Sequence, residues 1–216
     1  MTQKSNRTIR QAVRLIKVGH HEEAVRLLQE FTKENPHSIE GWYNLGVALA
    51  EANRSEDAVR AYDEALAIDT MIFEIWFNKG TVLYQLKDFK GAKQCYEKAV
   101  ELRPDDAEAW NNLGDSQSRL GEGKEAIESY TRAVALKPDY AQAFYNKANA
   151  HFIEGDDEHA IAYAELAVKL DPKLSEMVEQ WIHVSRARLN AQKDQEEYEK
   201  RTEPAKRLDL NLNGDS

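Results

Sequence analysis

The sequence has little that would support a disulfide-bonded, membrane-spanning or nucleic-acid-binding protein. Its 216 residues include one cysteine, Cys95, which excludes an intrachain disulfide framework and is typical of a reducing compartment. No apolar run is long enough to span a membrane, and the start, MTQKSNRTIRQ, lacks the apolar core of a signal peptide. The formal net charge of −9 argues against nucleic acid as the main partner. We therefore expect a cytoplasmic protein with no membrane insertion and no nucleic-acid partner.

Residues arranged for catalysis or for cofactor binding are also missing. There is no glycine-rich phosphate loop, and the six histidines show no metal-ligand spacing with acids or with the cysteine. His20 and His21 fall in an expected turn, where we interpret them as a solvated pair. Three others are scattered across expected helices: His151, His159 and His183. We therefore predict no enzyme, no cofactor and no metal site.

What the chain does contain is a pattern that recurs every 34 residues. Within residues 107–140, two amphipathic helical patterns flank the turn LGEGK, and their marks are Trp110, Leu113, Gly114, Ala126, Tyr130, Ala133 and Pro138. The same marks recur at Trp42, Gly46, Ala58 and Tyr62, and at Trp76, Gly80, Ala92 and Tyr96. A fixed period with two helices in each unit predicts an array of helical pairs.

The array occupies residues 1–174, and other patterns follow it. Its units are 5–38, 39–72, 73–106, 107–140 and 141–174. Residues 175–200 predict a capping helix whose second half is polar all round, and residues 201–216 predict a flexible tail. Thr70 replaces the proline that ends most units, and the apolar run Met71–Phe73 follows it. We interpret this run as a tight contact between repeats, with a binding patch or a hinge as alternatives.

These marks resemble the tetratricopeptide repeat (TPR) family, whose pattern is W-x2-L-G-x2-Y, then A-x3-F/Y-x2-A, then P. The resemblance covers residues 5–174, with local departures such as Ala164 in place of the second-helix aromatic. It implies an all-α fold, a right-handed α-solenoid of about five TPR helix-turn-helix units plus a C-terminal capping helix. The small residues of each unit are expected to let its two helices pack closely.

The resemblance also implies a peptide-binding surface on the concave face, which the first helix of each unit lines. An asparagine ladder recurs there at Asn44, Asn78, Asn112 and Asn146. Because an amide offers a donor and an acceptor, it can pair with a peptide unit of any sequence; a similar ladder serves the O-GlcNAc transferase family. The alternative is that these asparagines bond locally between helices. Around the ladder we expect Tyr43, Phe77, Tyr84, Tyr145, Phe152, Glu40, Glu74, Glu108 and Asp115, with Arg10 and Lys17 at the N-terminal end.

These observations predict a non-enzymatic adaptor or scaffold that binds a peptide segment or a helix of another protein. The carboxylate clamp of co-chaperone TPR domains does not fit, because its lysine positions hold Ile9, Tyr43, Phe77, Asn111 and Tyr145. Two other functions stay open. The tail or the capping helix could dock in the groove of a second copy, or the chain could be an accessory subunit that presents substrate to an enzyme such as a glycosyltransferase.

Overall fold

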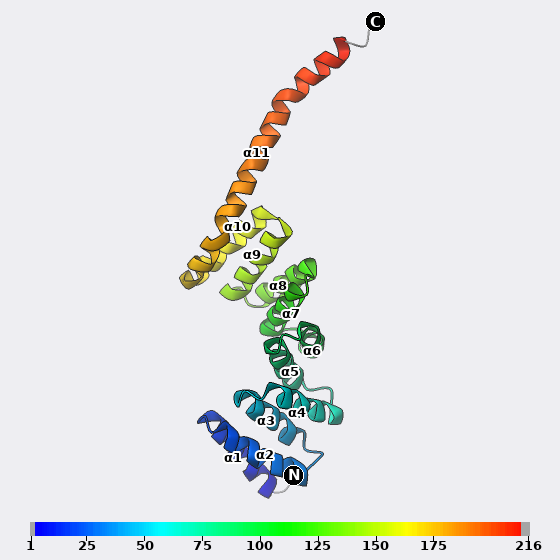
Figure 1. Cartoon of the computed structure of the whole chain (residues 1–216), viewed down its shortest axis with the longest axis vertical. Coiled ribbons are helices and arrows are strands. Elements are labelled where there is room, and N and C mark those ends of the chain that lie inside the picture. The colour runs from blue at the N-terminus through cyan, green and yellow to red at the C-terminus, as the bar shows by residue number, and fades with distance from the viewer. Residues whose placement is uncertain (1–2, 213–216) are drawn as a thin grey trace. The chain divides into compact units, whose positions relative to one another are not determined.

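The computed structural model describes the backbone of residues 3–212 and the side chains of residues 7–202. Over this range the regular secondary structure is entirely helical, so the predicted all-α class is confirmed (Figure 1). The chain folds into two compact units, Met1–Leu136 and Lys137–Ser216. The boundary follows the second helix of the fourth predicted repeat.

The first unit consists of consecutive helical pairs, one for each predicted repeat. The pairs are α1 (Gln3–Lys17) with α2 (His21–Glu34), α3 (Ile39–Glu51) with α4 (Ser55–Ile68), α5 (Phe73–Gln85) with α6 (Phe89–Leu102), and α7 (Ala107–Arg119) with α8 (Gly123–Leu136). The second helix of a pair packs on the first helix of the next pair, and α3, α5 and α7 also contact one another in sequence. We call the surface formed by α3, α5 and α7 the first-helix face.

Glycines in the first helices let the second helices approach closely, as the sequence predicts. A Cβ atom placed on Gly114 would lie 2.6 Å from Cε1 of Tyr130, and one on Gly46 would lie 2.5 Å from Cε1 of Tyr62. Since carbon atoms in contact are about 3.5–4.0 Å apart, either side chain would have to displace the tyrosine ring. Ala126, which the pattern places in the second helix of the same repeat as Gly114, is fully buried.

The turns within pairs need one residue with left-handed backbone. Gly19 and Gly121 supply it at φ 82° and 79°, while Asn53 and Lys87 adopt φ 59° and 63°. Asn53 takes the place of a glycine in its turn, since asparagine tolerates this region best after glycine. Lys87 has no such tolerance and holds a strained conformation.

Each tryptophan that recurs at the 34-residue spacing holds the loop that precedes its helix. The indole Nε1 donates a hydrogen bond to the carbonyl oxygen six residues earlier, joining Trp42 to Pro36, Trp76 to Thr70 and Trp110 to Pro104 over 2.8, 2.8 and 2.9 Å. Thr70 thus keeps the bond although it lacks the proline ring. The acceptor is a backbone atom, so the bond does not depend on the residue type.

The apolar run after Thr70 contributes to packing through two of its three residues. Phe73 is buried, and the guanidinium carbon of Arg103 lies 3.8 Å from its ring centroid. Ile72 packs against the core of the preceding helices, whereas Met71 is 73% exposed. The interpretation as a tight contact therefore holds for Ile72 and Phe73 but not for Met71.

The second unit contains one helical pair and a long final helix. It comprises α9 (Ala141–Glu154), α10 (Asp157–Leu170), a short 3₁₀ turn (Pro172–Leu174) and α11 (Ser175–Leu212). Trp181 and Ile182 of α11 are buried in one apolar cluster with Ala160 and Ala164 of α10. Ala164 stands in place of the second-helix aromatic, and α11 supplies large side chains to the cluster.

The predicted end of the final helix at Lys200 is wrong, because α11 continues to Leu212. Residues 201–212 of the expected flexible tail are therefore helical in backbone, and 213–216 lie outside the described residues. Good helix formers fill this region, and the pairs Glu196–Lys200 and Glu197–Arg201 lie one turn apart at 3.9 and 3.5 Å. Within the described part of the chain, no helix is long and apolar enough to cross a membrane.

Candidate functional site

The first-helix face contains two hollows, both within the first unit. The larger has a volume of about 320 Å³ and lies where α3 and α5 meet. Its lining residues are Val47, Ala50, Glu51, Asn53, Tyr62, Asn78, Thr81, Val82 and Gln85. This lining combines apolar side chains from α3 and α5 with polar groups from the same helices. Such a surface can accept an apolar side chain and also hydrogen-bond the backbone beside it.

The smaller hollow, of about 180 Å³, lies where α5 and α7 meet. Its lining residues are Thr81, Tyr84, Gln85, Tyr96, Asn112 and Asp115. Four of the predicted site residues therefore line the two hollows: Asn78, Tyr84, Asn112 and Asp115. Thr81 and Gln85 line both hollows, and the sequence did not indicate them because their types do not recur at the 34-residue spacing.

Asp115 is held in a hydrogen-bond network rather than presented as a free acid. The Tyr130 hydroxyl donates to its Oδ1 at 2.7 Å, and Asn111 Nδ2 approaches its Oδ2 at 3.4 Å. Burial raises the pKa of Asp115 above its ordinary value, while the bond from Tyr130 and the charge of Arg119 oppose that rise. Arg119 also donates from Nε to the Tyr84 hydroxyl at 3.2 Å. The network links α7 to α8 and to the preceding α5.

The asparagine ladder is not uniform, because its four side chains have different partners. Asn44 is buried and donates to the carbonyl oxygen of Glu40 at 2.7 Å, within its own helix. Asn78 donates to the Tyr43 hydroxyl at 3.1 Å, between neighbouring repeats. The Asn78 bond is of the kind that the alternative interpretation describes, a local bond between helices, whereas the Asn44 bond stays within α3.

The other two rungs accept hydrogen bonds from their own helices. Asn112 Oδ1 lies 3.4 Å from Asn111 Nδ2, and Asn146 Oδ1 accepts from Gln142 Nε2 at 2.9 Å. Asn78 and Asn112 are the two rungs that also line a hollow.

The predicted aromatic residues of the first unit are held by other aromatic rings. Phe77 stacks on Phe73 with centroids 5.5 Å apart and meets the edge of Tyr96 at 5.9 Å. Tyr43 lies 6.3 Å from Tyr62. Burial of the Tyr43 hydroxyl raises its pKa, so it is a neutral hydrogen-bonding group.

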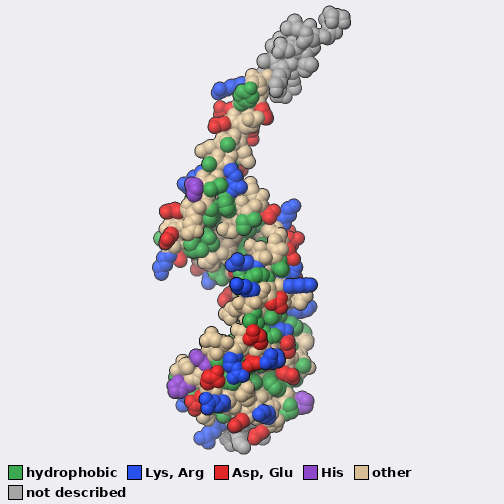
Figure 2. Space-filling model, viewed as in Figure 1, with side chains coloured by type: hydrophobic (Ala, Val, Ile, Leu, Met, Phe, Trp, Pro, Cys, Tyr) green, Lys and Arg blue, Asp and Glu red, His purple; other side chains and the backbone are tan. Residues whose placement is uncertain are grey.

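The predicted acidic and basic residues do not form a single acidic rim. Glu74 accepts a 2.6 Å bond from Arg103, and this guanidinium holds the pKa of Glu74 below its ordinary value. Glu40 and Glu108 are exposed, as are Arg10 and Lys17 at the N-terminal end. Figure 2 shows acidic and basic side chains interspersed over the visible face of the first unit, with no basic stripe on that face.

Two predicted site residues of the second unit have packing partners there. The ring of Phe152 stacks on Trp181 at 4.9 Å, and the Arg188 guanidinium carbon lies 4.7 Å from its centroid. The ring of Phe152 is thus partly buried against α11, and its place on the candidate surface stays a prediction. Tyr145 is partly buried against the same cluster.

Cys95 offers no reactive thiol. It is 3% exposed, and burial raises its pKa to about 11, so the thiol is protonated at neutral pH. Cys95 is therefore a packed core residue beside the buried Tyr96.

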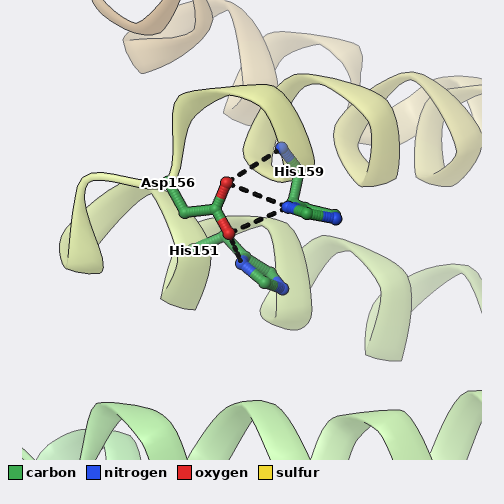
Figure 3. Close-up of side chains that lie close together, drawn as sticks. All are labelled: His151, Asp156 and His159. Atoms are coloured by element: carbon green, nitrogen blue, oxygen red, sulfur yellow. Dashed lines mark hydrogen bonds and ion pairs between the residues drawn. The ribbon is translucent and has the colours of Figure 1, made fainter.

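A second polar cluster lies in the second unit, at the turn between α9 and α10 (Figure 3). His151 comes from the end of α9, Asp156 caps α10, and His159 lies in the first turn of α10. We expected these histidines to be unrelated because they belong to different helices. The tight turn brings both imidazoles to the carboxylate of Asp156. The signal in the sequence is a histidine before the turn and an Asp-x-x-His after it.

Helical pairs repeated at a fixed spacing, with glycines packed against tyrosines, define an α-helical repeat protein. The family profile described as Tetratricopeptide repeat matches residues 9–70, 77–141 and 113–175. The chain therefore belongs to the tetratricopeptide repeat family, as its marks predicted. Among curated proteins, none matches this sequence.

Solved structures of other proteins share the fold. MamA from Desulfovibrio magneticus RS-1, from residue 41 to its end, has a TM-score of 0.75 and 26% identity, covering 80% of this chain and 98% of its own. A crystal structure of MamA protein gives 0.74 and 21%, covering 82% and 96%. YrrB, described as a TPR protein with an unusual peptide-binding site, gives 0.70 and 24%, covering 76% and 85%. These similarities show that the helical-repeat fold is shared.

Proposed function

We propose that this protein is a non-enzymatic interaction scaffold that binds an extended peptide segment of another protein on its first-helix face. The observation that carries the proposal is the pair of hollows between α3, α5 and α7, each with one asparagine of the ladder in its lining, Asn78 in the larger and Asn112 in the smaller. The resemblance to YrrB, which is described as having a peptide-binding site, supports it. The proposed location is the cytoplasm, since the one cysteine is typical of a reducing compartment.

The chemistry of the hollows indicates the kind of segment that would bind. Val47, Ala50 and Val82 offer the larger hollow apolar contacts, which favour an aliphatic or aromatic anchor from the ligand. The amides of Asn78 and Asn112 would pair with peptide units on either side of that anchor. A strongly basic ligand is not required, because Arg103 already pairs with Glu74.

The test begins with a phage-displayed library of random linear peptides, selected on the full chain. Affinity of a selected peptide is then measured by calorimetry for the wild type and for Asn78→Ala with Asn112→Ala. We expect the double variant to bind more weakly by about 1–3 kcal/mol in total, since two amide hydrogen bonds are lost. Ala50→Trp, which fills the larger hollow, should reduce binding without touching either amide.

The matched control is Asn190→Ala, an exposed asparagine of α11 that belongs to neither the ladder nor the lining of a hollow, which should bind the peptide as the wild type does. Circular dichroism must show that the variants keep their helix content. An affinity unchanged in the folded double variant and in Ala50→Trp would sink the proposal. The asparagines would then serve packing only.

A second candidate function, self-assembly, is favoured by the outer half of α11. Residues 190–201 are exposed, and Tyr198 is 63% exposed. No other helix of the second unit, as far as the structure describes it, therefore covers this stretch. It could dock on the first-helix face of a second copy. Light scattering over a range of concentrations, on the full chain and on a chain ending at Asn190, tests this. A monomer in both cases excludes it.

A further inference from the structure

The cluster of His151, Asp156 and His159 has a geometry that its packing role does not require. Asp156 Oδ2 lies 3.0 Å from His151 Nδ1 and 2.9 Å from His159 Nδ1. One ligand atom from each residue lies within 4.8 Å of the others. Figure 3 shows both imidazoles directing the same ring nitrogen at one carboxylate. Helix capping accounts for Asp156 alone, because its Oδ1 accepts from the backbone N–H of His159 at 3.3 Å.

We propose that His151, Asp156 and His159 form a binding site for a divalent first-row transition ion, with Zn²⁺ as the best match. Two imidazole nitrogens and one carboxylate oxygen make a three-ligand set that zinc accepts, and a fourth position stays open to water or to a further ligand. The site belongs to the second unit and is independent of the peptide surface.

Two of the three ligand-atom separations fit such an ion with little movement, and the third lies within 4.8 Å. Zinc bonds of about 2.0–2.1 Å in a tetrahedral arrangement place neighbouring ligand atoms about 3.3–3.4 Å apart. The two nitrogen–oxygen distances of 3.0 and 2.9 Å need to open by only a few tenths of an ångström. On binding, each neutral imidazole would carry its proton on Nε2 instead of Nδ1, so that both Nδ1 lone pairs and the carboxylate oxygen face the ion. The ring planes are already within 25° of each other, with centroids 5.1 Å apart.

His151 is the buried ligand of the set, and its Nδ1 faces Asp156 at 3.0 Å. Its Nε2 is buried without a hydrogen-bond partner among the described residues. Nδ1 is therefore the nitrogen that this residue offers to an ion, and a neutral imidazole that binds through Nδ1 carries its proton on Nε2.

The charge and exposure around the cluster allow an ion to enter. The turn segment 154–158, EGDDE, carries four acidic residues, which attract a divalent cation. Two positive charges oppose this attraction: Lys147, whose ammonium lies 4.0 Å from the centroid of Tyr163, and Arg188, which pairs with Asp157 at 3.2 Å. The side chains of His159 and Asp156 are 58% and 40% exposed, against 11% for His151. The ion would thus sit on a buried ligand with its open position toward solvent.

The test uses the full chain, freed of metal by a chelator and then titrated. Zn²⁺ binding is measured by calorimetry, and Co²⁺ binding by the visible absorption that reports tetrahedral coordination. We expect one saturable site per chain and a higher midpoint of thermal unfolding with Zn²⁺. His159→Ala and Asp156→Asn should each weaken binding at least about tenfold, because even indirect supports of a metal site are worth about 10–100-fold.

The variants are chosen so that a folding failure cannot be mistaken for loss of the site. His159 is exposed, and asparagine caps a helix about as well as aspartate. The matched control is His183→Ala, an exposed histidine of the same unit, which should bind zinc as the wild type does. His20→Ala with His21→Ala controls for the histidine pair of the first unit. Absence of saturable binding, or equal binding by His159→Ala and Asp156→Asn, overturns the proposal.

Discussion

Replacing Tyr130 by phenylalanine removes one hydroxyl from the interior of the fourth repeat. That hydroxyl donates to Asp115 Oδ1 at 2.7 Å, a length typical of a strong bond to a carboxylate. A hydrogen bond to a charged group contributes about 1.5–3 kcal/mol, and the remaining Asn111 contact to Asp115 is long, at 3.4 Å. We therefore expect Tyr130→Phe to lower the free energy of unfolding by about 1.5–3 kcal/mol at neutral pH.

The neighbouring repeat offers a matched substitution at the equivalent position. Tyr96 shares a 3.1 Å hydrogen bond with the Thr81 hydroxyl, so both partners are neutral. Tyr96→Phe should therefore cost less, about 0.5–1.5 kcal/mol. In the second repeat, Val47 stands where the third repeat has Thr81 and the fourth has Asp115. Because valine offers no polar group, Tyr62→Phe should cost least.

The pH dependence separates these variants. Burial raises the folded-state pKa of Asp115 above its ordinary value, and the bond from Tyr130 limits that rise. Tyr130→Phe should raise the pKa further. The penalty of the substitution is then full at neutral pH, where the carboxyl is ionised, and shrinks as the pH falls through the pKa of Asp115. At acid pH it should approach the penalty of Tyr96→Phe, which itself should not change with pH.

Urea unfolding followed by circular dichroism and by tryptophan fluorescence measures these differences. The comparison uses the shift in transition midpoint, because a repeat protein need not unfold in one step. Equal shifts for Tyr130→Phe and Tyr96→Phe at neutral pH would refute the charge-assisted bond. A penalty of Tyr130→Phe that does not change with pH would refute the role of the ionised Asp115.

Two further substitutions test the packing of the repeats. Gly114→Ala should lower the free energy of unfolding by about 1–3 kcal/mol in urea, because its Cβ would lie 2.6 Å from the Tyr130 ring. Gly80→Ala should cost less, because the nearest atom to its Cβ is 3.0 Å away. The reverse order of the two costs would contradict this account. Lys87→Gly should raise the free energy of unfolding by about 0.5–1 kcal/mol, because glycine accepts φ 63° without strain. Lys90→Gly, inside α6, should lower it by about 1 kcal/mol in the same assay, and a loss of stability in Lys87→Gly would show that the strain is absent.

The helical pairs could be predicted from the sequence because each mark of the period is a packing contact. Gly114 recurs because the Tyr130 ring fills the space its side chain would take. The end of α11 could not be predicted in the same way. Burial ends near Leu189, and beyond it only local helix preference, which is a weak signal, sets where the helix stops.

The candidate site was predictable by position but not by bonding. Asn78 reaches the Tyr43 hydroxyl, 35 residues earlier, whereas the residue 35 before Asn44 is the buried, apolar Ile9. Asn44 therefore turns back to Glu40. Asparagines at equivalent positions thus have different hydrogen-bond partners, because the neighbouring repeat differs. The pattern of a single repeat does not contain that information.

The tryptophans that fasten the loops also give each repeat its own fluorophore. The chain has four tryptophans, and Trp42, Trp76 and Trp110 each donate a hydrogen bond to the loop of a different repeat. The fourth, Trp181, is buried in the apolar cluster of α11. Opening of one loop would wet one indole and shift the emission of that repeat alone. Variants that keep a single tryptophan would therefore read out local unfolding repeat by repeat without an added label.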